Sequence, residues 1–317
     1  MGIAIGVDVG GTKIAVGAVN EAGELLTMVS SPTPAADPQS VLDTIVNAIT
    51  KVREQYEVSA VGVGAPGFID ASRKVIRFSP NISWENEPLA DRISEATGLP
   101  VFLENDANSA AWAEYKFGAA RGAQSVAVIT VGTGIGGGIV IDGKLVRGAY
   151  GFGGEIGHMN MVPDGRVCGC GEQGCWEMYS SGSALKQAGK DVAARDPEYA
   201  KQILALGDGT VEGVSGRHVT QAARAGDPAA LDCYGEIGKW LGQGMADLAA
   251  LLDPEVFILA GGVSEAGNIL LEPAVEQFES RLTACKYRHV APVRLAELGN
   301  EAGIIGAADL ARMELQS

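Results

Sequence analysis

A strand–glycine turn–strand pattern occurs twice in this chain, and no other feature limits the fold so strongly. In residues 3–26, an apolar run leads into the turn VGGT (9–12), and a second apolar run, a polar turn and a third apolar run follow. Residues 126–146 repeat this order around the turn VGTG (131–134). Short apolar runs joined by glycine turns are typical of antiparallel strands, and a repeated unit indicates two related halves. We therefore expect a duplicated strand–glycine turn–strand core.

Helix-like and strand-like segments alternate between and after the two copies. Apolar residues recur at helical spacing in residues 38–56, 89–97, 107–117, 183–195, 218–225, 229–252, 271–284 and 302–313. Short apolar runs typical of buried strands lie at residues 60–66, 101–103, 256–259 and 293–295. This alternation predicts an α/β fold with central sheets. From the repeat we expect a small domain of residues 1–108, completed by residues 303–317, and a large domain of residues 109–302.

The charge balance limits the partners of the chain. Its net charge of −15 disfavours binding of nucleic acids or anionic membranes through a broad basic surface. No apolar run reaches the ~20 residues that a membrane-spanning helix needs. Because strand-like residues begin at residue 3, we expect no signal peptide and hence a cytoplasmic protein.

Cysteines and histidine concentrate in one short segment. Three of the five cysteines and one of the three histidines lie within it: His158, Cys168, Cys170 and Cys175. Three thiolates and an imidazole are a ligand set of closed, tetrahedral zinc sites. A disulfide would leave one cysteine over, and clustered cysteines in a cytosolic chain favour a metal or catalysis. A nucleophilic cysteine stays open, although no separate base is evident. We predict a structural Zn²⁺, with Glu155 and Glu177 beside it.

Three glycine-rich turns suit the binding of phosphate groups, because their backbone N–H groups can approach an anion closely. They comprise Gly10, Gly11, Thr12 and Lys13; Gly132, Thr133, Gly134, Ile135, Gly136, Gly137 and Gly138; and Gly261 and Gly262. Asp8, just before the first turn, is placed to help hold Mg²⁺ or its water. The spacing matches neither a Walker loop nor a Rossmann fingerprint. Each turn alone is also explained by a plain hairpin, but together they favour a nucleotide.

Residues 104–108 (ENDAN) connect a predicted strand to a predicted helix. Asn105 or Asp106 is an ordinary helix N-cap, and the local sequence favours that interpretation. A carboxylate at a helix N-terminus also stays ionised beside the positive end of the helix dipole, where it can accept a proton from a substrate hydroxyl. Both interpretations stay open at this point.

Taken together, these residues resemble the ROK family of repressors and sugar kinases, in the actin-like ATPase superfamily, and within it the glucokinases. The likeness runs along the whole chain. Besides the motifs above, it depends on GEIGH (154–158), CGCGEQGCWE (168–177) and SPNISWENEPL (79–89). The resemblance implies a two-domain actin-like (ribonuclease H-like) α/β fold.

The resemblance also implies an activity, the ATP-dependent phosphorylation of the 6-hydroxyl of glucose. Asp106 matches the base that deprotonates this hydroxyl and contacts the sugar. The other sugar-binding positions are Gly67, Asn81, Asn105, Glu155, His158 and Glu177. The turns at 8–13 and 132–138 match those that hold Mg·ATP phosphates, and Gly261 and Gly262 match positions near the adenosine. His158 would bind zinc through one ring nitrogen and a sugar hydroxyl through the other.

Alternatives remain within and outside this class. Kinases for mannose, fructose or an N-acetylhexosamine differ from this pattern only in pocket detail, and polyphosphate is an alternative donor to ATP. A sugar-responsive repressor is the alternative of another class. Family repressors carry an N-terminal helix-turn-helix, which we do not expect here because strand-like residues begin at residue 3. Since family members are commonly dimers or tetramers, we expect a homodimer or homotetramer.

Overall fold

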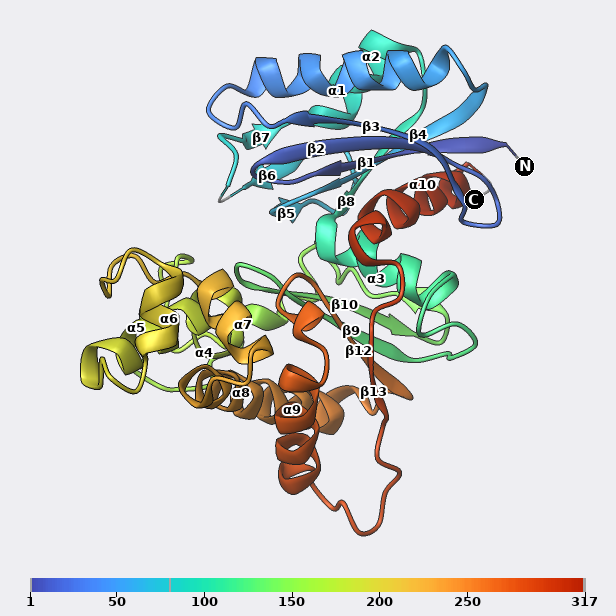
Figure 1. Ribbon diagram of the computed structural model, residues 1–317. Coiled ribbons are helices and arrows are strands. Elements are labelled where there is room, and N and C mark those ends of the chain that lie inside the picture. Colours follow the sequence, from blue (N-terminus) through green and yellow to red (C-terminus); the bar gives the residue numbers. More distant parts are fainter. Residues whose placement is uncertain (1, 80, 316–317) are drawn as a thin grey trace. The chain divides into compact units, whose positions relative to one another are not determined.

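The computed structural model describes residues 2–79 and 81–315 (Figure 1). The chain divides into two compact units. Unit 1 comprises Met1–Ala127, Gly138–Gly154 and Ala296–Ser317, and unit 2 comprises Val128–Gly137 and Glu155–Leu295. Within the described residues, no helix is long and apolar enough to cross a bilayer.

The central sheet of unit 1 has the strand order β3-β2-β1-β4-β8. The strands are β1 (Ile3–Val9), β2 (Lys13–Val19), β3 (Leu25–Pro32), β4 (Val58–Ala65) and β8 (Val101–Asn105). The first three form an antiparallel meander, and β4 and β8 add in parallel beside β1. In this register Asp8 lies opposite Gly64, and Gly64 lies opposite Glu104. The sheet therefore places Asp8 and the ENDAN segment at the same edge, the carboxyl ends of parallel strands.

Helices cover both faces of this sheet (Figure 1). The helices α1 (Pro38–Arg53) and α2 (Leu89–Thr97) pack on the large apolar residues of one face, and α3 (Asp106–Lys116) and α10 (Ala302–Glu314) lie on the other. Along β1, large residues alternate with Ala4, Gly6 and Asp8. The small residues let α10 approach closely: a Cβ added to Gly6 would lie only 1.9 Å from the Ile304 carbonyl oxygen.

A second five-stranded sheet has the order β11-β10-β9-β12-β13. Its strands are β9 (Val126–Val131), β10 (Ile135–Ile141), β11 (Lys144–Leu145), β12 (Val256–Ala260) and β13 (Val293–Leu295). This order matches β3-β2-β1-β4-β8 position by position. As in the first sheet, the outer hairpin is antiparallel and the last strand is added in parallel. The repeated topology confirms the duplicated core that the sequence predicted.

The helices of unit 2 are α4 (Glu177–Ser180), α5 (Gly182–Arg195), α6 (Lys201–Leu206), α7 (Gly216–Arg224), α8 (Pro228–Leu252) and α9 (Asn268–Arg281). Helix α8 begins where the Asp227 side chain accepts from the Ala230 N–H (2.9 Å), and Asp253 in a left-handed conformation ends it. Helix α9 starts and ends three residues earlier than predicted, because Gly267, at φ +64°, precedes its first turn and Leu282 is extended. The short helix α6 was not predicted.

Three short strands of unit 1 were also not predicted from the sequence. They are β5 (Phe68–Ile69), β6 (Ile76–Phe78) and β7 (Glu85–Glu87), and they form a small antiparallel sheet. Strands of two or three residues are too short to show an alternating pattern. This sheet follows Gly67 in the chain and encloses the segment that contains Asn81.

Candidate active site and metal site

The ENDAN segment forms the junction between β8 and α3, as predicted. Asn105 is the N-cap: its Oδ1 accepts from the Asn108 N–H (3.1 Å). Its Nδ2 donates to the Gly67 carbonyl (3.3 Å). Asp106 is the first residue of the helix, and its Oδ1 accepts from the Ala107 N–H (2.8 Å). Because Asn105 provides the cap, the Asp106 carboxylate is not required for that role.

Two carboxylates of unit 1, Asp8 and Asp106, have raised pKa values at this edge of the sheet. Burial and the charge of Asp106 raise the pKa of Asp8 to about 6, although Lys13 lowers it in part. Burial also raises the pKa of Asp106. Two half-buried carboxylates that lie close together form an environment in which a divalent cation would be stabilised.

The first glycine turn closes the β1–β2 hairpin. Its Gly10 N–H donates to the Lys13 carbonyl (2.9 Å), and the Gly10 carbonyl accepts from the Thr33 hydroxyl (2.7 Å). Residues 11–13 are exposed, so their N–H groups and the Lys13 ammonium are open to a ligand. A Cβ added to Gly11 would lie 3.5 Å from the Asn81 Cβ. Unit 1 therefore brings Asn81 next to the first glycine turn.

The second glycine turn is shorter than the sequence suggested. The turn itself is Gly132–Thr133–Gly134, and Ile135, Gly136, Gly137 and Gly138 already belong to strand β10. At Gly138 a Cβ would lie 2.1 Å from the Ala111 Cβ, so that glycine permits close packing against α3. The third turn lies beside the second: the Val263 N–H donates to the Val131 carbonyl (3.0 Å), and Gly261 has a φ of +87°.

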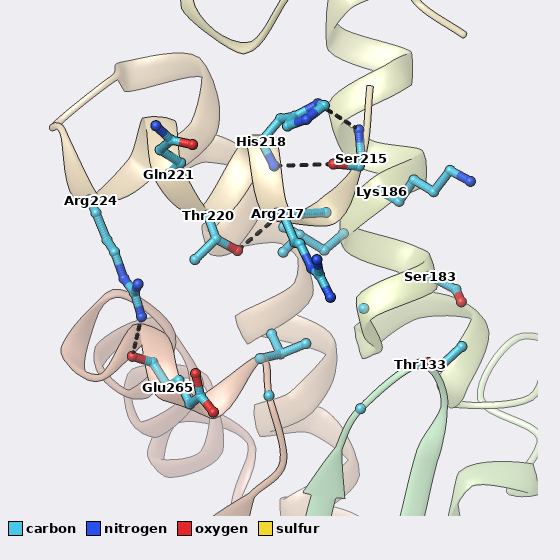
Figure 2. A pocket seen from close by; sticks show the side chains of 16 residues that line it. Thr133, Ser183, Lys186, Ser215, Arg217, His218, Thr220, Gln221, Arg224 and Glu265 are labelled. Atoms are coloured by element: carbon cyan, nitrogen blue, oxygen red, sulfur yellow. Dashed lines mark hydrogen bonds between the residues drawn. The ribbon is translucent and has the colours of Figure 1, made fainter. Parts of the chain in front are cut away.

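A cavity of about 1360 Å³ opens beside these two turns in unit 2 (Figure 2). Thr133 and Gly262 line it, together with the starts of α5 and α7. Both helices have a serine N-cap, Ser181 and Ser215, whose hydroxyls accept from backbone N–H groups (3.2 and 3.3 Å). Helix N-termini attract anions through their free N–H groups and dipoles.

The charged side chains of the cavity are mainly basic, although the whole chain is acidic. Lys186, Arg217 and Arg224 line it, and Glu265 is the acidic member. Figure 2 shows Arg217 extending from α7 toward the side of Ser183 and Thr133, whereas Arg224 donates to the Glu265 carbonyl (2.8 Å). Sequence reasoning missed these residues, because single basic residues on two different helices leave no local pattern.

The structure brings the four predicted metal ligands together. The ligand atoms of His158, Cys168, Cys170 and Cys175 all lie within 4.8 Å of one another. The Cys170 and Cys175 sulfurs are 3.7 Å apart, and so are the Cys168 sulfur and the His158 Nδ1. Zinc–sulfur bonds of about 2.3 Å in a tetrahedron separate two sulfurs by nearly this distance. The donor set therefore fits Zn²⁺.

Glu177 connects the cysteine segment to the second glycine turn. Its Oε1 accepts from the Cys168 thiol (3.0 Å), and its Oε2 accepts from the Ile135 N–H (3.4 Å). A Cβ on Gly134 would lie 2.2 Å from the Glu177 Oε2. A larger residue at Gly134 would therefore displace the Glu177 carboxylate.

The remaining predicted sugar ligand of unit 2 is Glu155, which precedes the 3₁₀ turn Ile156–His158. Its carbonyl accepts from the His158 N–H (3.1 Å), and both side chains are half-buried. The buried Trp176, whose indole donates to the Trp240 carbonyl (2.8 Å), anchors the chain between Cys175 and Glu177. Unit 2 thus brings Glu155 and His158 together in one turn.

This arrangement, a duplicated sheet core with glycine turns at its strand ends, is the fold of actin-like sugar kinases. The ROK family model matches residues 4–314, and the chain belongs to the ROK family. It is 50% identical to a glucokinase of Streptomyces coelicolor over 98% of both chains, and 38% identical to one of Halalkalibacterium halodurans over 99% of this chain and 96% of that one. A ROK family glucokinase of Streptomyces griseus, solved with glucose and AMPPNP, is similar at a TM-score of 0.90 and 49% identity, covering 98% of this chain and 100% of that one.

Proposed function

We propose that this protein is an ATP-dependent glucokinase, which transfers the γ-phosphoryl group of ATP to the 6-hydroxyl of glucose. The observation that carries the proposal is the likeness, at 49% identity over 98% of this chain, to a glucokinase solved with glucose and a nucleotide analogue. The residue chemistry supports it independently. Phosphoryl transfer needs positioning, charge neutralisation and a base for the acceptor hydroxyl, and the chain contains groups suited to each.

Asp106 is proposed to be the base. It lies at the N-terminus of α3 and is not needed as the cap, because Asn105 caps the helix. Burial raises its pKa, and a carboxylate whose pKa is closer to the working pH is a stronger base. Asp106 accepts the proton of the 6-hydroxyl as that oxygen attacks the γ-phosphorus.

The residues proposed to bind the sugar carry hydrogen-bonding groups. In unit 1 these are Gly67, Asn81 and Asn105, besides Asp106, and in unit 2 they are Glu155, His158 and Glu177. The carboxylates accept from sugar hydroxyls, and the Asn105 amide is held by its bonds to Asn108 and Gly67.

Zn²⁺ is proposed to bind His158, Cys168, Cys170 and Cys175, which fit it in number and spacing. A closed four-ligand zinc site has a structural role. Bound there, the ion would orient the His158 ring, and Cys168 lies against Glu177. In this way the cysteine segment holds two proposed sugar ligands without taking part in the transfer.

ATP is proposed to bind at the three glycine turns and in the basic cavity of unit 2. The phosphates are contacted by Gly10, Gly11, Thr12 and Lys13 and by Gly132–Gly138. The adenosine lies near Gly261 and Gly262. Bound Mg²⁺ would neutralise phosphate charge, and Asp8 would hold the ion or its water. Arg217 and the N-termini of α5 and α7 add positive potential to the same cavity.

We also propose a domain division, an oligomeric state and a cellular location. The repeat favours a small domain of residues 1–108 with 303–317 and a large one of residues 109–302. The family resemblance favours a homodimer or homotetramer. The clustered thiols favour the reducing cytoplasm, where they remain available to a metal.

A coupled assay with a panel of sugars and donors tests the proposal. Purified protein is given glucose, mannose, fructose or an N-acetylhexosamine, each with Mg·ATP or with polyphosphate. We expect the highest kcat/KM for glucose with ATP. A higher value for another sugar or donor would replace this assignment with that one, and no turnover with any pair would contradict the kinase function.

A further inference from the structure

Glu104 is a buried carboxylate directly before the proposed base motif, and no role has yet been given to it. Its side chain is 5% exposed. One oxygen, Oε1, accepts from the Asn105 N–H (3.2 Å) and from the Asn108 Nδ2 (3.0 Å). Glu104 therefore contacts residues on both sides of Asp106 in the sequence.

The other oxygen of Glu104 meets two arginines that are far apart in the sequence. The Arg147 Nε donates to Oε2 at 2.7 Å, and an Arg73 guanidinium nitrogen lies 3.7 Å from the same oxygen. Burial of a carboxylate is costly unless it is paired and hydrogen-bonded. Here both oxygens have partners.

Arg73 is held in place by its own contacts. Its Nε donates to the Leu103 carbonyl (3.0 Å), the Leu103 N–H donates back to the Arg73 carbonyl (3.0 Å), and its guanidinium pairs with Glu314. The residue has a φ of +58°, which is unfavourable for a side chain with a Cβ. Such strain persists only where the surroundings require it.

Arg147 connects Glu104 to the segment that leads to Glu155. The chain after Arg147 forms a tight loop in which the Gly153 N–H donates to the Arg147 carbonyl (2.8 Å). This loop packs on strand β5 within unit 1: Phe152 meets Phe68 edge to face, at 5.6 Å between ring centroids. The Arg147–Glu104 ion pair thus fixes the start of the loop to the β8–α3 junction.

We propose that Glu104 is a positioning residue for the kinase reaction, which holds Asn105 and Asp106 in their working geometry through its ion pair with Arg147. The proposal rests on the proposed function, because it takes Asp106 as the base. Glu104 makes no contact with the reactants in this scheme. Its carboxylate sets the backbone at Asn105 and the side chain of Asn108, between which Asp106 is placed.

The test uses Glu104→Gln, Arg147→Met and the double variant of the full-length protein. Glu104→Gln places an NH₂ group at one of the two oxygen positions and a neutral, weaker acceptor at the other. Arg147→Met removes the guanidinium. Since a small misplacement of a reacting group can cost ~100-fold in rate, we expect each single variant to lower kcat by roughly 10- to 100-fold, with the KM for ATP within about twofold of wild type. If both act through one ion pair, the double variant loses no more than the worse single variant.

The control is Glu87→Gln, the same substitution at another carboxylate of unit 1, which pairs with Arg92 at 2.5 Å. It should leave kcat unchanged. Arg147→Lys, which keeps the positive charge, should recover part of the activity. Equal losses in Glu87→Gln, or losses that multiply in the double variant, would overturn the positioning role.

A second measurement does not depend on catalysis. Hydrogen exchange without substrates should become faster at residues 104–109 in Glu104→Gln, with the remaining segments of unit 1 unchanged.

If the wild type phosphorylates no sugar, the proposed function fails, yet the exchange still tests whether Glu104 holds the junction. If Glu104→Gln does not fold, the Arg147 variants decide, because the Arg147 side chain is 28% exposed and Arg73 still faces the Glu104 Oε2 after its loss. Wild-type kcat and exchange in folded variants would refute the inference.

Discussion

At the scale of single residues, the two carboxylates Asp8 and Asp106 have raised pKa values because desolvation disfavours their charged forms, and Asp8 also because Asp106 is near. Such groups destabilise the folded state when ionised and are retained where function needs them. Asn105 can cap α3 without any help from Asp106. A substitution at either acid should therefore reduce activity without reducing stability.

For Asp106→Asn we expect kcat to fall by about 10²- to 10⁴-fold, the usual contribution of a general base. The amide oxygen can still accept from the Ala107 N–H, so glucose binding should change only a few-fold. Removal of a buried carboxyl with a raised pKa should leave Tm equal or higher at neutral pH. Steady-state kinetics, glucose titration and thermal unfolding check these points. A kcat within tenfold of wild type would exclude Asp106 as the base.

For Asp8→Asn the effect on stability should depend on pH. The folded-state pKa is about 6 and the ordinary value is 3.8, so the native protein binds more protons between these pH values. Its free energy of unfolding therefore falls as the pH rises through this window. Since one pKa unit corresponds to about 1.4 kcal/mol, the gain from Asp8→Asn should be small near pH 4 and approach at most about 3 kcal/mol at pH 8. Urea unfolding without Mg²⁺ or nucleotide measures it, and a gain independent of pH would contradict this origin.

At the scale of elements, the cysteine segment (159–176) consists of turns and isolated bridges, with no helix or extended strand. Isolated bridges join Asn160 to Cys175 and Val167 to Gln173. Burial raises the pKa values of the Cys168 and Cys175 thiols, so a metal that binds the thiolates must displace their protons. The geometry of this segment should therefore depend on the ion.

Cys170→Ser is the most informative variant of this segment, because Cys170 is exposed and its loss disturbs little packing. We expect bound zinc to fall from about one ion per chain to well below one, and hydrogen exchange at residues 156–178 to accelerate. Through the contact of Cys168 with Glu177, the KM for glucose should rise. The matched control is Cys285→Ser, which lies outside the cluster. Wild-type zinc content in Cys170→Ser would contradict the assigned ligand set.

At the scale of the whole molecule, ligands that bind only the folded protein should raise its apparent stability. At 100 times Kd, glucose should contribute about 2.7 kcal/mol, a rise in Tm on the order of 5 °C for a chain of this size. Mg·AMPPNP should stabilise the protein as well. Glycerol at the same concentration as glucose controls for a general solvent effect. Thermal unfolding is the measurement, and equal shifts with glucose and glycerol would speak against a glucose site.

The sequence by itself determined the features that depend on residues close together in the chain. The duplicated core was readable because each copy lies within about two dozen residues, and alternating apolar runs around a glycine turn allow few other folds. The ligands His158, Cys168, Cys170 and Cys175 were readable from their residue types and close spacing. The strand–helix junction at Asn105 was also readable, although whether Asn105 or Asp106 provides the cap was not.

Only the tertiary structure decided the features that join distant segments. It showed that Gly136–Gly138 lie in β10, that α5 and α7 contribute basic groups to one cavity, and that Arg73 and Arg147 meet at Glu104. The physical reason is that secondary structure and turns follow local periodicity and backbone preference. The partners of a buried charge depend on how sheets and helices pack, and a single arginine 30 or 40 residues away leaves no pattern in the sequence.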